Sequence, residues 1–106
     1  MTMTMKDLTS KTFDEFISKG NSVIDFHADW CGPCKIMEPI LKDTSERTEG
    51  VKFARVDVDK EGGLAERFQV MSIPTLIFFK GKDQVDRFTG VLHKDELAKR
   101  VKALSK

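Results

Sequence analysis

The chain has few features that would suit export, a membrane or a nucleic acid. Its 106 residues include only two cysteines and one tryptophan. The 18 basic and 17 acidic residues leave a formal charge of +1, so no electrostatic footprint for nucleic acid or an anionic membrane is present. The longest wholly apolar run, residues 76–79, is far too short to cross a bilayer.

Targeting signals and internal boundaries are also lacking. Residues 1–6 have no apolar core of the kind found in a signal peptide. Residues 94–97 read Lys-Asp-Glu-Leu, but this retention signal acts only at a C-terminus. Two cysteines without an export signal predict a cytoplasmic location, where thiols stay reduced. No linker, repeat or low-complexity segment interrupts residues 1–106, so we expect a single domain.

Hydrophobic periodicity predicts alternating strands and helices. The expected strands cover residues 3–7, 23–28, 51–58, 75–79 and 84–89, and the expected helices cover residues 10–18, 32–47, 63–68 and 94–104. The first helix should be capped near Thr9 or Ser10, and Pro39 should kink the second. The second helix should bury an apolar stripe of Ile36, Met37, Ile40 and Leu41. This order predicts the α/β class, with a mixed sheet flanked by helices.

The two cysteines are close together at the start of the second predicted helix. They lie in the segment Trp30-Cys31-Gly32-Pro33-Cys34-Lys35. Side chains three positions apart on a helix have Cβ atoms about 5–6 Å apart. A disulfide needs about 3.5–4.5 Å, so a small tightening of the first turn closes the bond. Because so small a ring adds only about 2 kcal/mol of stability, the spacing favours reversible redox chemistry.

The start of the helix also predicts which thiol reacts first. Free N–H groups and the positive end of the helix dipole favour a thiolate at Cys31, and the thiolate is the nucleophile. Pro33 suits the first turn because the N–H that it lacks is not needed there. Cys34 lies one turn deeper and should be more buried. We therefore predict that Cys31 attacks and that Cys34 resolves.

The motif resembles the active-site motif of the thioredoxins, and the resemblance extends along nearly the whole chain. The further landmarks, in the family's order, are Asp25-Phe26, Asp57-Val58-Asp59, Ile73-Pro74-Thr75 and Gly90. The resemblance implies a thioredoxin fold, which is a central mixed five-stranded sheet flanked by four helices. It implies a thiol–disulfide oxidoreductase that reduces protein disulfides by dithiol–disulfide exchange.

The same resemblance implies the partners and the redox centre. Substrates would be proteins that contain disulfides, and a separate thioredoxin reductase would regenerate the dithiol. No metal or organic cofactor is expected, because the Cys31–Cys34 disulfide is itself the redox centre. We expect a monomer that binds neither nucleic acid nor membrane. The electron donor, linked to NADPH or to ferredoxin, stays open.

Asp25 is a candidate catalytic residue within an apolar strand. Burial of a carboxylate is costly and raises its pKa. One interpretation is a strand-end aspartate that faces water. The resemblance implies the other, a buried carboxylate behind the cysteines that exchanges protons with Cys34. We favour the second, since titratable groups beside a reactive centre are typical of functional sites.

Two candidate modulators depart from the family's pattern. Arg55 stands where thioredoxins commonly have a lysine near the buried aspartate. Because arginine stays protonated, it is either a group that holds the pKa of Asp25 low or a solvated rim residue. His27 stands where many thioredoxins have tryptophan, on the same strand face as Asp25. It is either a charge beside the thiols or a surface histidine without a role.

The resemblance also predicts where a substrate docks. It implies a cis peptide bond before Pro74, although only about 5–6% of X–Pro bonds in folded proteins are cis. The corresponding shallow apolar docking surface comprises Trp30, Val58, Ile73, Pro74, Gly90 and Val91.

Four other interpretations compete with a reductase. Zinc also binds Cys-x-x-Cys pairs, but only His27 and His93 could complete the ligand set, at spacings that fit no finger or ribbon. A purely structural disulfide is disfavoured in a reducing compartment. An oxidant or isomerase is disfavoured, by resemblance, because Gly and Pro separate the cysteines. A non-catalytic binding module is disfavoured by the intact cysteine pair together with Asp25.

Overall fold

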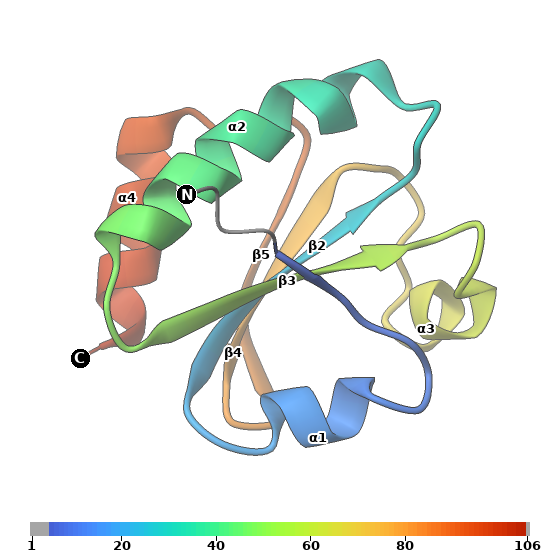
Figure 1. The fold of residues 1–106 in the computed structure, drawn as a ribbon, viewed down its shortest axis with the longest axis horizontal. Coiled ribbons are helices and arrows are strands. Elements are labelled where there is room, and N and C mark those ends of the chain that lie inside the picture. Colours follow the sequence, from blue (N-terminus) through green and yellow to red (C-terminus); the bar gives the residue numbers. More distant parts are fainter. Residues whose placement is uncertain (1–4, 106) are drawn as a thin grey trace.

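The computed structural model describes residues 5–105, which form a five-stranded sheet with helices on both faces (Figure 1). The elements in chain order are β1 (Lys6–Asp7), α1 (Phe13–Ile17), β2 (Asn21–His27), α2 (Gly32–Arg47), β3 (Val51–Asp57), α3 (Gly62–Arg67), β4 (Thr75–Lys80), β5 (Asp83–Thr89) and α4 (Lys94–Leu104). The strand order across the sheet is β1-β3-β2-β4-β5. The first three of these are parallel, and β4 and β5 are each antiparallel to their neighbours. The mixed sheet predicted from the sequence is confirmed.

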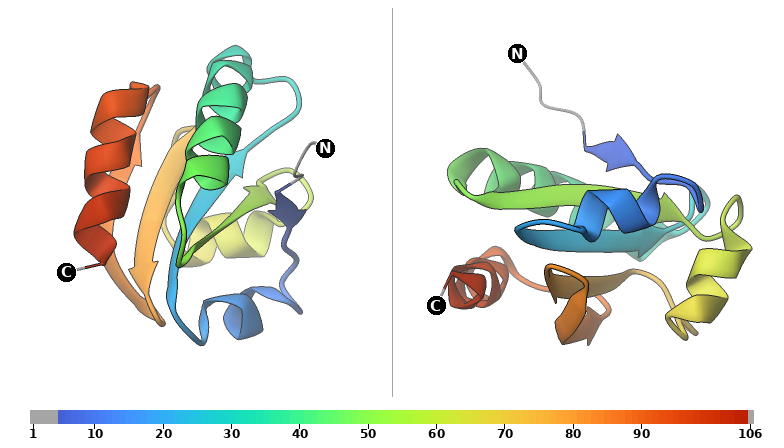
Figure 2. Two further views of the ribbon diagram at one scale, coloured as in Figure 1. Left: turned by 60° about the vertical axis from the view of Figure 1, so that its left-hand side comes forward. Right: turned by 90° about the horizontal axis from the view of Figure 1, so that it is seen from below.

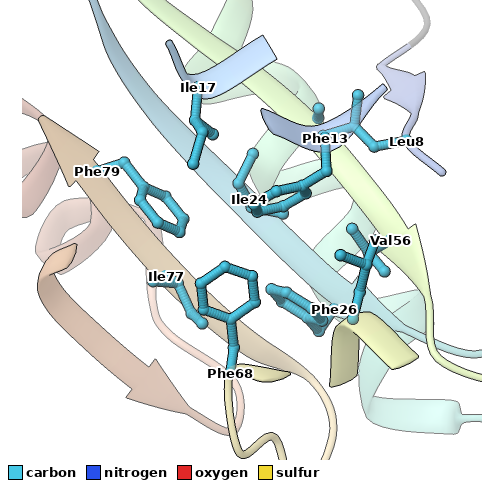
Figure 3. Packing of buried hydrophobic residues seen from close by; sticks show 11 residues of the cluster. Leu8, Phe13, Ile17, Ile24, Phe26, Val56, Phe68, Ile77 and Phe79 are labelled. Atoms are coloured by element: carbon cyan, nitrogen blue, oxygen red, sulfur yellow. The ribbon is translucent and has the colours of Figure 1, made fainter. Parts of the chain in front are cut away.

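The alternation of side chains along β2 divides the core into two layers. Ile24 and Phe26 point to the face that α1 and α3 cover, where the rings of Phe13, Phe68 and Phe79 lie 5.1–5.9 Å apart (Figure 3). Val23 belongs to the opposite layer, which is built from buried residues of α2 and α4. Figure 2 shows these two helices together on their side of the sheet.

Because helices cover both faces, the central strand β2 has no side that faces solvent. Every residue from Ser22 to His27 is buried. Asp25 and His27 have the same parity as Val23, so they lie on the α2 side of the sheet. The fold therefore carries two ionisable side chains into its interior, directly beneath the helix that begins with the cysteines.

The start of α1 differs from the prediction. The helix begins at Phe13, after the predicted residue 10, and Thr12 occupies the N-cap position without a side-chain cap hydrogen bond. Thr9 nevertheless caps the turn that leads into α1, because its Oγ1 accepts the Lys11 N–H at 3.2 Å and its carbonyl accepts the Phe13 N–H at 2.9 Å. The Thr9 N–H donates to Thr12 Oγ1 at 2.9 Å, and the Ser10 N–H donates to Glu61 Oε1 at 2.9 Å. These bonds hold the preceding residues in a turn.

Three other predictions concern β1 and α2. Residues 3 and 4 of the first predicted strand lie outside the described residues, and β1 covers only Lys6–Asp7. Helix α2 has the predicted bounds and continues through Pro39. The predicted stripe is wrong at Ile36, which is 56% exposed, because the helix presents Met37 and Leu41 to the core.

Within residues 5–105, no helix is both long enough and apolar enough to span a membrane.

Candidate active site

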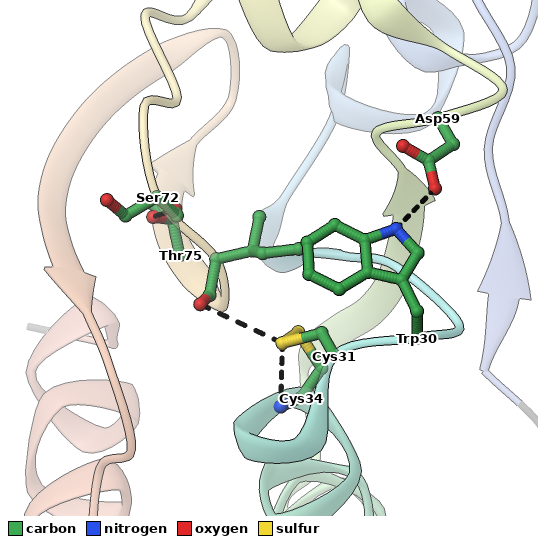
Figure 4. The surroundings of a disulfide bond; sticks show 7 residues. Trp30, Cys31, Cys34, Asp59, Ser72 and Thr75 are labelled. Atoms are coloured by element: carbon green, nitrogen blue, oxygen red, sulfur yellow. Dashed lines mark hydrogen bonds between the residues drawn. A yellow bond between two sulfur atoms is a disulfide. The ribbon is translucent and has the colours of Figure 1, made fainter.

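The junction between β2 and α2 brings the two cysteines together. Cys31 is the N-cap residue of α2 and Pro33 lies in its first turn. The cysteines form a disulfide with their Cα atoms 5.2 Å apart, and the Cys34 N–H donates to Cys31 Sγ at 3.2 Å (Figure 4). The first turn contains no acidic residue. The partial positive charge of the helix start therefore acts on Cys31 unopposed, which favours its thiolate once the disulfide is reduced.

The burial of the two sulfur-bearing residues differs from the prediction. Cys31 and Cys34 are each 4% exposed, so the expectation that Cys34 is the more buried is wrong for the disulfide form. The bridge ties Cys31 back onto the helix, while Ala28, Val58 and Ile73 pack around the pair. Burial in the disulfide form therefore does not distinguish the two cysteines, whereas their positions relative to the helix end do.

The surface next to the disulfide is formed by three separate segments. Trp30 is 71% exposed, and its Nε1–H donates to Asp59 Oδ2 at 2.7 Å (Figure 4). The Ile73 carbonyl oxygen lies 3.8 Å from Cys31 Sγ. The Ile73–Pro74 peptide bond is cis, which confirms the expectation.

The remaining members of the predicted docking surface are Pro74, Gly90 and Val91. Pro74 is buried, and its carbonyl accepts a 2.8 Å hydrogen bond from the Gly90 N–H. Gly90 has φ +109°, a conformation that favours glycine. Val91 is half-buried and packs against the core beneath α2 and α4. The structure thus gathers Trp30, Val58 and Ile73 at the disulfide, with the other three residues behind or beside them.

Asp25 lies in the interior behind Cys34. It is 2% exposed, and its Oδ1 has no hydrogen-bond partner among residues 5–105. The interpretation of a strand-end aspartate facing water is therefore wrong. Burial raises the pKa of this carboxyl from its ordinary 3.8 to about 7; the charge of Arg55 opposes the rise and that of Glu38 adds to it. Both Asp25 and Cys34 line a cavity of about 60 Å³.

Arg55 is the positive charge that acts on Asp25. It is the β3 partner of Asp25 in the sheet register, and its side chain is only 22% exposed, so it is not a solvated rim residue. Its Nε donates to Asp7 Oδ1 at 3.0 Å and its Nη1 to Glu38 Oε2 at 3.2 Å. Arg55 thus lowers the pKa of Asp25, as predicted, but burial has the larger effect.

The opposing effects of burial and of Arg55 on the pKa of Asp25 predict what happens when Arg55 loses its charge. In Arg55→Gln the pKa of Asp25 should rise above its value of about 7, because burial and Glu38 then act without opposition. The carboxyl-carbon NMR titration of the two proteins measures the change. Arg67→Gln is the matched control, since Arg67 pairs with Asp14 of α1. An Asp25 titration that is the same in Arg55→Gln and in the parent protein would contradict the assignment.

His27 is buried in the same cavity. It is 5% exposed and its Nε2 has no hydrogen-bond partner among the described residues, so the interpretation as a surface histidine is wrong. Burial, followed by the charge of Arg55, lowers the pKa of His27 below its ordinary 6.5. The imidazole is therefore neutral at neutral pH. His93, the other histidine, is exposed at the start of α4.

Sequence reasoning assigned no role in the site to Glu38 or to Asp59. Glu38 lines the cavity and pairs with Arg55. Its position four residues after Cys34 on one helix was a usable signal, because such residues share a helix face. Asp59, the partner of Trp30, is 29 positions away, and no local pattern connects the two. In the described part of the chain, no group of three or more His, Cys, Asp or Glu residues could hold a metal ion.

Comparison with known proteins gives the family. The family model described as Thioredoxin matches residues 4–103. The chain belongs to the thioredoxin family. Thioredoxins of Chlamydia caviae and Staphylococcus haemolyticus are each 41% identical to it, over 88% and 91% of this chain and 91% and 93% of their own.

Solved structures agree with the assignment to the thioredoxin family. A mutant thioredoxin from Halobacterium salinarum NRC-1 superimposes with a TM-score of 0.89 at 31% identity, over 95% of this chain and 90% of its own. An oxidised mitochondrial thioredoxin of Saccharomyces cerevisiae gives 0.86 at 32% identity, over 93% and 94%. The protein is thus a thiol–disulfide oxidoreductase of this family, with Cys31 and Cys34 as the redox pair for dithiol–disulfide exchange.

Proposed function

We propose that Cys31 is the nucleophile and Cys34 the resolving thiol in the reduction of protein disulfides. The Cys31 thiolate attacks one sulfur of the substrate, and the other substrate sulfur leaves with the bonding electron pair. Cys34 then loses its proton and attacks Cys31 Sγ. The Cys31–Cys34 bond forms as the mixed disulfide breaks, so the substrate gains two electrons. The observation that carries this assignment is the place of Cys31 at the start of α2, with the Cys34 N–H donating to its sulfur.

Asp25 is the base that takes the proton of Cys34. Its burial, its pKa of about 7 and the cavity that it shares with Cys34 support this role. A base works best when its pKa is close to the pH at which it operates. No other carboxylate on the cavity wall is buried, since Asp29 and Glu38 are exposed.

The substrate docks over the edge of the disulfide as an extended segment. The exposed Trp30 ring and the Ile73 carbonyl beside Cys31 Sγ support this, since a free carbonyl can accept a hydrogen bond from an extended chain. The proposed surface comprises Trp30, Val58, Ile73, Pro74, Gly90 and Val91. Gly32, Pro33 and Lys35, which are exposed in the first turn of α2, complete its border.

The protein acts in the cytoplasm as a monomeric single domain, and a thioredoxin reductase restores its dithiol. A reducing compartment suits a pair that must return to the dithiol after each turnover. The formal charge of the whole chain is only +1, so we propose neither a nucleic acid nor an anionic membrane as a partner. The proposed substrates are proteins with disulfides that the Cys31 thiolate can reach.

The direct test is reduction of a disulfide-containing protein, such as insulin, with a regenerating system. We expect sustained turnover with either an NADPH-linked or a ferredoxin-linked reductase, and none with Cys31→Ser. The choice of reductase identifies the electron donor. Binding of the substrate without reduction in either system would instead support a non-catalytic module. A redox potential in the range of disulfide-forming enzymes would support an oxidant.

A further inference from the structure

The cavity between β2 and α2 has a buried wall and an exposed rim. Asp25, His27 and Cys34 form its wall together with Ala28, and all four are buried. The exposed residues Asp29, Lys35 and Glu38 form its rim. Its volume of about 60 Å³ has room for about two water molecules, at about 30 Å³ each. The cavity therefore connects the resolving cysteine and the buried carboxyl with the protein surface.

Two buried polar atoms in this cavity have no partner among the described residues. They are Asp25 Oδ1 and His27 Nε2. Two residues along a strand correspond to about 6.7 Å, which is too far for a direct hydrogen bond but can be spanned by one or two waters. An apolar side chain in place of His27 would leave no buried nitrogen unpaired, so packing alone does not account for an imidazole here.

We propose that His27 transfers the proton of Asp25 between the cavity and solvent, a role that rests on the proposed function of Asp25 as the base for Cys34. Cys34 gives its proton to the Asp25 carboxylate before attacking Cys31. The protonated carboxyl then passes this proton through cavity water to the neutral imidazole, which releases a proton to water that leads to the exposed rim. No electrons move in this step, and Asp25 returns to its ionised form for the next turnover.

The charges around His27 are compatible with such a role. The charged or titratable groups around the imidazole come from β1, β2, α2 and β3. They are Asp7 of β1, Asp25 of β2 and Asp29 after it, Cys34, Lys35 and Glu38 of α2, and Arg55 and Asp57 of β3. Burial and Arg55 lower its pKa, while Asp57, Asp7 and Asp29 oppose that change. The imidazole is therefore neutral near neutral pH, so it can take up the proton of Asp25 only transiently and then releases it.

The test separates the two chemical steps with Ellman's reagent. Attack by Cys31 releases the first thionitrobenzoate, and attack by Cys34 on the mixed disulfide releases the second. In His27→Gln the first release should be unchanged. The second should slow about tenfold at about pH 6, where Asp25 starts protonated, and should match the parent protein at about pH 9, where it does not. Added imidazole should return the second release in His27→Gln to the rate of the parent protein. His93→Gln, at the exposed histidine, should behave as the parent protein does.

The possible outcomes distinguish the relay from the proposed function. Equal rates at every pH, or a slowing that does not depend on pH and is not restored by imidazole, would overturn the role of His27. If Asp25→Asn slows the second release while His27→Gln does not, only the relay fails. If Asp25→Asn leaves the second release unchanged, the role of Asp25 fails as well. His27→Trp, which has no group that titrates in this range, should repeat the result if the glutamine variant does not fold.

Discussion

Cys34→Ser is expected to hold Cys31 in a stable mixed disulfide with a substrate protein. The variant retains the helix start that activates Cys31, so the first attack should proceed. Release should then slow by about a thousandfold or more, because the intramolecular thiol is lost and effective molarities for such groups are very high. Non-reducing electrophoresis and mass spectrometry of the adduct measure the trapping.

The matched variant for this experiment is Cys31→Ser. It retains Cys34, which lies within the first turn of α2 and is 4% exposed. No adduct should form, and alkylation of the reduced parent protein near neutral pH should label Cys31 far faster than Cys34. Trapping by Cys31→Ser, or equal labelling of the two thiols, would reverse or remove the assignment of nucleophile and resolving thiol.

Asp25→Asn should make the oxidised protein about 4 kcal/mol more stable at pH 8. Burial raises the pKa of this carboxyl from 3.8 to about 7, a difference of about 3 units at 1.36 kcal/mol each. Below pH 3.8 the folded and unfolded states are both protonated, so this group has no effect. As the pH rises towards 7 the unfolded state ionises first, and the parent protein loses stability until Asp25 also ionises in the folded state.

Urea unfolding of both proteins at several pH values measures this difference. The gap between Asp25→Asn and the parent protein should be near zero at pH 3.5 and largest above pH 7. Parallel stability curves across this range would show that the carboxyl is not perturbed. The same variant should reduce disulfides more slowly at neutral pH and recover in alkali, where Cys34 ionises without a base. A gain in stability with a loss of activity is typical of a buried group kept for its chemistry.

The sequence predicted the order and type of the elements because their patterns are local. The predicted ranges of the second and fourth helices are the ranges of α2 (Gly32–Arg47) and α4 (Lys94–Leu104) in the structure. Strand alternation placed His27 on the face of Asp25, which is confirmed. The cis bond before Pro74 came from the family resemblance, since no local pattern specifies it.

Features that depend on distant residues could not be predicted. Whether Asp25 faces water or the interior depends on α2, which covers its face of the sheet. The hydrogen bond from the Ser10 N–H to Glu61, 51 residues away, has no local signal in the sequence. The pairing of Trp30 with Asp59 requires the end of β3 to lie beside the start of α2. Each of these features joins segments that lie far apart in the sequence and meet only in the folded chain.

The alternation along β2 has a consequence for how such a protein evolves. Phe26 and Ile24 belong to the aromatic layer beneath α1 and α3, whereas Asp25 and His27 belong to the opposite face. Substitutions on the α2 face can therefore change proton chemistry while the aromatic layer keeps its packing. Selection can therefore adjust reactivity and fold stability through neighbouring positions of a single strand.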